Sequence, residues 1–239
     1  MNRFIMTSLV GTIATAALVV GAGAPAFAST STPTPATKTT RTLESVQTAA
    51  KTATGKRETA LSAAIAKLDL ARGISASDKA TLVDRLNADF AGMKAIEAKI
   101  AADTTLAAAS TDLKTIFTTY RVFGVAIPQA RIVAGIDRAT SIDIPKLTAS
   151  QSKLATVLTG KDASQSSAAL QSDLADMTKQ IAAASTELSG ASVKVLAITP
   201  ADYNSNKTVV TSARASVKTA QSYLKQARAD RKAILAALK

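Results

Sequence analysis

The chain has 239 residues, of which 47% are hydrophobic and only 3% aromatic, and its 29 Lys and Arg against 17 Asp and Glu give a formal net charge of +12. It contains no Cys, His or Trp. The lack of thiols and imidazoles excludes disulfides, Cys/His metal sites and the Ser-His-Asp and Cys-His catalytic arrangements, and the positive charge predicts that any binding partner is acidic.

Residues 1–28 have the pattern of a secretory signal peptide. Arg3 supplies the positive start, residues 4–20 the apolar region, and Ala26-Phe27-Ala28 a cleavage site before Ser29. The alternative is an uncleaved anchor helix, which the glycines and the proline in this segment disfavour. We therefore expect an exported protein, either secreted or associated with the cell wall. Loss of Arg3 with the leader would leave a net charge of 12 − 1, or +11.

Residues 29–42 form a tract rich in Thr, Ser and Pro with no apolar side chains to bury. Such a composition predicts a disordered linker, whose hydroxyl groups are also potential glycosylation sites.

Residues 43–239 are rich in Ala, Leu, Lys, Gln and Arg, which favour helix, and apolar side chains recur there every three or four positions. We predict an all-α fold for this domain. The expected architecture is an elongated, antiparallel, coiled-coil-like bundle of about four to six helices, the longest of about 30 residues and so about 45 Å in length.

The first expected helix runs from Leu43 to about Arg72, and Gly73 provides its stop. Ser77 is the predicted cap of a second helix, and a third is expected to begin at about Thr105. The second helix has the cleanest amphipathic pattern in the chain, with these residues facing inward: Leu82, Leu86, Phe90, Met93, Ile96 and Ile100.

The central stretch, residues 116–137, holds three of the six aromatic side chains found after residue 28. We expect it to supply the densest part of the core, because Ala elsewhere buries little area. Gly124 and Pro128 indicate a break within it. Five side chains are predicted to be buried where the chain reverses: Phe117, Tyr120, Phe123, Ile127 and Ile132.

The next helix is expected from about Pro128 to Gly160, with a kink or a restart at Pro145. Asp162 is the predicted cap of the helix after it, which should last to about Ala197.

Thr199 and Asp202 have the spacing of a capping box that starts a short helical turn. The last helix is expected from about Thr208 to Leu238. Its predicted inward residues are Val210, Val217, Ala220, Leu224, Ala227, Leu235 and Leu238.

Most of the positive charge belongs to this last segment. From Lys207 onward there are eight basic residues and one acid, Asp230, so +7 of the expected +11 lies here. At about 100° per residue, six basic side chains fall within roughly 60° of one another. They are Lys207, Arg214, Lys218, Lys225, Lys232 and Lys239, and with the nearby Arg228 they form the candidate polyanion-binding set. A solvated face that only keeps the protein soluble is the simpler interpretation of the same pattern.

No catalytic pattern is complete. Two Ser-x-x-Lys pairs, Ser150 with Lys153 and Ser222 with Lys225, lack the partner motifs of serine acyl-enzymes. The carboxylate pairs Asp173/Asp176 and Asp137/Asp143 lack an aromatic platform for a sugar substrate. We predict no catalytic, cofactor-binding or metal-binding residues.

Two segments resemble a known group of proteins. The run from Tyr120 to Val133 with Gly135-Ile136-Asp137-Arg138, and the run Pro200 to Asn204 with the helix from Ser216 to Leu238, are similar to secreted, Ala-rich helical proteins of actinobacteria. The resemblance implies a coiled-coil-like exported fold with no assigned activity. Pro145 departs from it, because these relatives tend to run a continuous helix there.

The sequence thus predicts a non-catalytic envelope or extracellular protein that binds an anionic cell-wall polymer, a membrane surface or a helical partner, which includes a second copy of itself. A wall-acting enzyme and a secreted nucleic-acid-binding protein are the alternatives. Export and the scarcity of aromatic stacking residues count against nucleic acid as the native partner.

Overall fold

A computed structural model describes residues 41–160 and 166–238. The predicted signal peptide, the linker except its last two residues, the predicted cap Asp162 and the candidate residue Lys239 lie outside these residues. The helices are α1 (Leu43–Leu70), α2 (Ala76–Ala102), α3 (Leu106–Thr118), α4 (Ile127–Arg138), α5 (Ile144–Thr159), α6 (Ala168–Leu188), α7 (Ala191–Leu196), α8 (Pro200–Ser205) and α9 (Val209–Ala237). Two π-helical segments, η1 (Val122–Ala126) and η2 (Ala139–Asp143), precede α4 and α5. These ranges contain no strand, so the all-α prediction is confirmed for them.

Several helix ends are where local chemistry predicts them. Thr105 caps α3, its hydroxyl accepting from the N–H of Ala108 at 3.3 Å, and Gly160 is the C-cap of α5. Thr199 and Asp202 form the predicted capping box of α8, because each side chain accepts from the other residue's backbone N–H. Side-chain caps of this kind depend only on neighbours in sequence, so the pattern alone can find them.

Other ends differ from the prediction. The cap of α2 is Ser75, whose hydroxyl accepts from the N–H of Asp78 at 3.0 Å, and not Ser77. A contact from outside the helix favours the earlier start, because the N–H of Ser75 donates to the buried carboxylate of Asp137 at 2.9 Å. Helix α6 begins after Ser167 and ends at Leu188, well before Ala197. Gly190, at φ 64°, separates it from the short α7.

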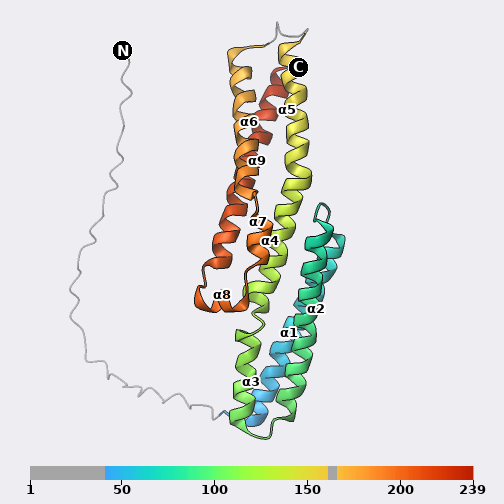
Figure 1. Ribbon diagram of the computed structural model, residues 1–239, viewed down its shortest axis with the longest axis vertical. Coiled ribbons are helices and arrows are strands. Elements are labelled where there is room, and N and C mark those ends of the chain that lie inside the picture. The colour runs from blue at the N-terminus through green and yellow to red at the C-terminus, as the bar shows by residue number, and fades with distance from the viewer. Residues whose placement is uncertain (1–40, 161–165, 239) are drawn as a thin grey trace, which may run out of the picture. The chain divides into compact units, whose positions relative to one another are not determined.

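The break between α3 and α4 comes slightly earlier than Gly124 and Pro128 indicate, and the chain does not reverse there, because both helices run in the same direction along α1 (Figure 1). The break comes just before η1, where Arg121 adopts a left-handed conformation with φ 46°. From Val122 to Thr159 the backbone is then helical without interruption, so of the predicted kink or restart at Pro145 the restart is wrong. The local irregularity near this proline is the π-helical segment η2, which ends two residues before it. In both π segments the residue before a proline, Ile127 or Ile144, donates its N–H to the carbonyl five residues earlier. We infer that these wider turns accommodate rings that would clash within a regular α-helix.

Helices α1 and α2 form an antiparallel pair, because Gln47 near the start of α1 reaches the carbonyl of Ile100 near the end of α2, and Asp69 near the end of α1 pairs with Lys79 near the start of α2. Helix α3 packs on both of them. Helix α9 packs along α6, and both also contact α5 (Figure 1).

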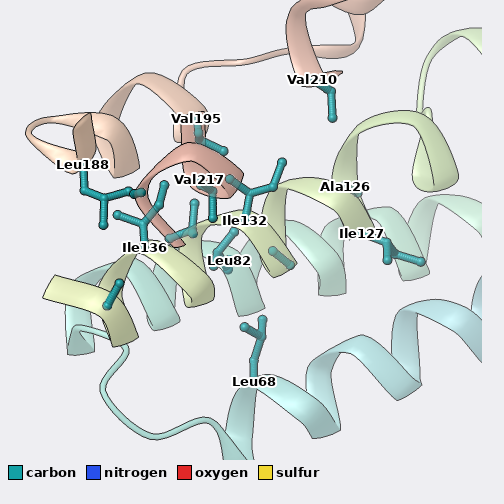
Figure 2. Packing of buried hydrophobic residues seen from close by; sticks show 14 of the residues in the cluster. Leu68, Leu82, Ala126, Ile127, Ile132, Ile136, Leu188, Val195, Val210 and Val217 are labelled. Carbon is teal, nitrogen blue, oxygen red and sulfur yellow. The ribbon is translucent and has the colours of Figure 1, made fainter. Parts of the chain in front are cut away.

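Helix α4 joins these groups, since it contacts α1, α2, α7 and α9. Figure 2 shows Ile132 and Ile136 of α4 close to Leu188, Val195 and Val217. Two of the five side chains predicted to be buried in the central stretch, Ile127 and Ile132, are buried in α4.

The prediction that the central aromatic side chains are buried is wrong for two of the three. Phe117 is 42% exposed and Phe123 52% exposed, while Tyr120 is half-buried. The break at Arg121 lies between the two phenylalanines, so the helical spacing that placed them on one face does not hold across it. Both rings instead flank the guanidinium of Arg57, whose Cζ lies 4.5 and 5.1 Å from the ring centres. These are cation–π distances.

Candidate polyanion-binding face

Helix α9 divides its side chains between a buried seam and an exposed cationic face. The seam toward α6 and its neighbours contains Val210, Val217, Ala220, Leu224, Ala227, Asp230 and Ile234. The cationic face consists of Arg214, Lys218, Lys225 and Lys232, which are all exposed. Because α9 is one continuous helix, its period places these four side chains on one stripe that extends about 27 Å along the axis.

The four residues of the cationic face have no intramolecular ion pair. In the parts of the chain that the structure describes, no carboxylate oxygen lies within 4.0 Å of their charged nitrogens. Their charge is therefore available to a ligand, since exposed Lys and Arg lose little favourable interaction when they turn toward an anion.

The structure sets two of the other three predicted residues apart from this face. Arg228 is engaged, with Nη2 3.2 Å from Asp143 Oδ1 at the start of α5, so it contributes less free charge than the sequence predicts. Lys207 is exposed but precedes α9, and its Nζ lies 4.7 Å from the ring centre of Tyr203. Lys239 is outside the described residues.

Two of the four carboxylates considered for catalysis, Asp137 and Asp143, make contacts between helices. Asp137 is buried and accepts from the Ser75 N–H and from the Ser192 hydroxyl, each at 2.9 Å, so it ties α4 to the start of α2 and to α7. Its sequence neighbour in the candidate pair, Asp143, holds Arg228. Across residues 41–160 and 166–238, no group of three or more Asp or Glu could hold a metal ion.

No protein-family model, curated protein or solved structure matches the chain. None of the helices searched, which are those of the described residues, has the length and hydropathy needed to cross a membrane.

A titratable group that the sequence analysis missed is Asp89 on α2. It lines a hollow of about 340 Å³ together with Arg85, Tyr120 and Gln129. Burial raises the pKa of the Asp89 carboxyl to about 6, because the charged form loses solvation there. Sequence periodicity could not show this, since Asp89 precedes the inward-facing Phe90, and the other walls of the hollow come from Tyr120, η1, α4 and the segment at the end of α7 and after it.

The raised pKa of Asp89 predicts that the stability of the fold depends on pH. Between about pH 4 and pH 6 the folded state binds a proton at Asp89 that the unfolded chain has released, so stability falls as pH rises through this window. The Asp89→Asn variant removes the cost of the buried charge. Its expected advantage over the parent is near zero at pH 4 and about 1 kcal/mol at pH 8, a figure reduced for partial solvent access.

Thermal unfolding followed by circular dichroism at both pH values measures this difference. The control is Asp84→Asn, an exposed carboxylate on the same helix, which should change stability by less than about 0.5 kcal/mol at either pH. An equal gain for Asp89→Asn at pH 4 and pH 8 would contradict the proposed titration.

Proposed function

We propose that this protein is a non-catalytic, exported helical protein that binds an anionic polymer of the cell envelope through the cationic face of α9. The observation that carries the proposal is that Arg214, Lys218, Lys225 and Lys232 are exposed, aligned and free of acidic partners among the described residues. The export pattern of residues 1–28 and the resemblance to secreted actinobacterial helical proteins support its location.

The spacing of the charges favours a linear polymer over a single small anion. Successive members of the face are four or seven residues apart, which is about 6 or 10 Å along a helix. One phosphate or carboxylate cannot contact all four charges, which extend over about 27 Å, whereas a chain of repeated anionic groups can. Binding of this kind releases counterions, so its affinity falls steeply with salt.

The test is sedimentation of the chain without residues 1–28 together with purified cell walls, prepared with and without their anionic polymers, across a salt series. The Lys218→Gln, Lys225→Gln, Lys232→Gln triple variant should bind about 20-fold more weakly at low salt, because each exposed charge contributes a fraction of a kcal/mol. The slope of log affinity against log salt should also become shallower by about 2.

The matched control removes the same charge elsewhere. Lys51, Lys114 and Lys153 are exposed on α1, α3 and α5, and the triple replacement of these by Gln should leave binding within about twofold of the parent. An equal loss in both triple variants would mean that net charge, and not the α9 face, drives binding. Pelleting that is absent, or insensitive to salt, would overturn the proposal, and release of soluble wall fragments would favour an enzyme.

A further inference from the structure

A second feature lies on another side of α4, where an open hollow of about 350 Å³ separates α1 from α4 and reaches Arg214 of α9. Its walls are mostly small or apolar side chains: Ala60, Ala64 and Leu68 of α1, and Ile127, Pro128 and Ala134 of α4. Figure 2 shows Leu68 and Ile127 at the α1 and α4 sides of this region.

The hollow follows from the sequence of α1. This helix packs mainly against α2, and the part of its surface that faces α4 carries Ala60, Ala63 and Ala64, with Leu68 as the one larger apolar residue of α1 that lines the hollow. A methyl group cannot fill the space between two helix backbones that a Leu or Ile side chain would fill. Phe123, half exposed at the same place, extends the apolar wall.

Three cations from three helices line the hollow as well. They are Lys67 of α1, Arg131 of α4 and Arg214 of α9, and all are exposed. No acidic residue lines it, and within the described ranges none of the three cations has a carboxylate oxygen within 4.0 Å. An apolar cavity with a few convergent polar groups is the usual form of a small-molecule site, and this volume is within the usual range.

We propose that this hollow binds a single-chain lipid with an anionic head group. The hydrocarbon chain would lie against the Ala-rich wall, and the carboxylate or phosphate would be met by Lys67, Arg131 and Arg214. The charges surround one apolar space, unlike the cationic face of α9, where they follow a line. This difference favours one small amphipathic anion over an extended acidic partner. The site is separate from the proposed polymer-binding face except for Arg214, which belongs to both.

The probe for the test is the dansyl derivative of undecanoic acid, titrated into the chain without residues 1–28 below its aggregation concentration and followed by its fluorescence. We expect saturable binding of one probe per chain. The methyl ester, which lacks the negative charge, should bind about tenfold more weakly, and so should the acid to the Lys67→Gln, Arg131→Gln double variant.

Two phenylalanine substitutions on α1 form a matched pair. Ala64→Phe places a ring in the hollow and should weaken probe binding at least about tenfold. Ala66→Phe adds the same ring at an exposed position of α1 that does not line the hollow, and should leave binding within about twofold. Circular dichroism of both variants shows whether each one is folded. If Ala64→Phe does not fold, the Lys67/Arg131 double variant and the ester still decide the question.

Equal binding of acid and ester, or equal binding by the Ala64→Phe and Ala66→Phe variants, would assign the probe to general apolar surface and overturn the proposal. The Lys218/Lys225/Lys232 triple variant should keep the probe and lose the wall polymer, while Ala64→Phe should do the reverse. Failure of either proposal is therefore recognisable without the other.

Discussion

Replacing Ile234 by Ala is expected to lower the free energy of unfolding by about 3 kcal/mol, the largest single effect that we predict. Ile234 is 0% exposed in the seam of α9. Removal of three carbon atoms there loses their transfer energy and leaves a cavity that the neighbouring helices fill only in part. Urea unfolding followed by circular dichroism measures the change, because the chain has no Trp to serve as a fluorescent reporter.

The adjacent residue is the control. Leu235 is 40% exposed, although the amphipathic pattern predicted it to face inward. Leu235→Ala should therefore cost less than about 1 kcal/mol, since a large part of the removed surface is already in contact with water. A larger loss for Leu235→Ala than for Ile234→Ala would show that α9 is rotated relative to the seam described above, and would also displace the cationic face.

Gln129→Met is expected to cost about 2 kcal/mol or more. Gln129 is only 4% exposed, and its Nε2 donates toward the carbonyls of Val195, Leu196 and Ile198 at 2.7, 3.3 and 3.1 Å. These carbonyls lie at the end of α7 and just after it. The Val195 carbonyl also accepts from the N–H of Ile198 at 3.1 Å, and the Leu196 carbonyl also accepts from Arg85 Nη1 at 2.5 Å. Met has a similar length and no donor, so buried carbonyls lose a partner that water cannot readily replace.

Gln47 makes the same kind of hydrogen bonds to a helix end at a more solvent-exposed position. Its Nε2 donates toward the carbonyls of Ile100, Ala101 and Asp103 at the end of α2, at 3.2 to 3.3 Å, but its side chain is only half-buried. Gln47→Met should cost about 1 kcal/mol or less, because water can hydrate the freed carbonyls. Both variants are compared with the parent by urea unfolding. Equal losses would mean that burial does not set the value of these hydrogen bonds.

Helix α9 shows which inward-facing residues the apolar pattern predicts correctly and which it does not. Apolar spacing alone placed Val217, Leu224 and their neighbours inward, and the structure agrees. After Ala227 the buried positions continue through Asp230 to Ile234. The apolar pattern does not assign a carboxylate to an inward position, and it therefore predicted that Leu235 faces inward. Asp230 is buried, and its Oδ1 accepts from Gln226 Nε2 at 2.8 Å while its Oδ2 is buried without a hydrogen-bond partner in the described part of the chain. This partial compensation depends on side-chain positions that the apolar pattern does not include.

The sequence by itself determined the helical class of the described region, the caps at Thr105 and Thr199, and the alignment of Arg214, Lys218, Lys225 and Lys232. Each of these depends on residues within one or two helical turns of each other, so the order of side chains along one helix is enough. The tertiary structure decided which basic side chains have an acidic partner among the described residues and where a hollow remains between helices. Asp143 neutralises Arg228 from another helix, cover from distant segments raises the pKa of Asp89, and the hollow exists because α1 meets α4 through alanines. Those outcomes depend on contacts between segments far apart in the chain, which the spacing of residues along any one helix does not encode.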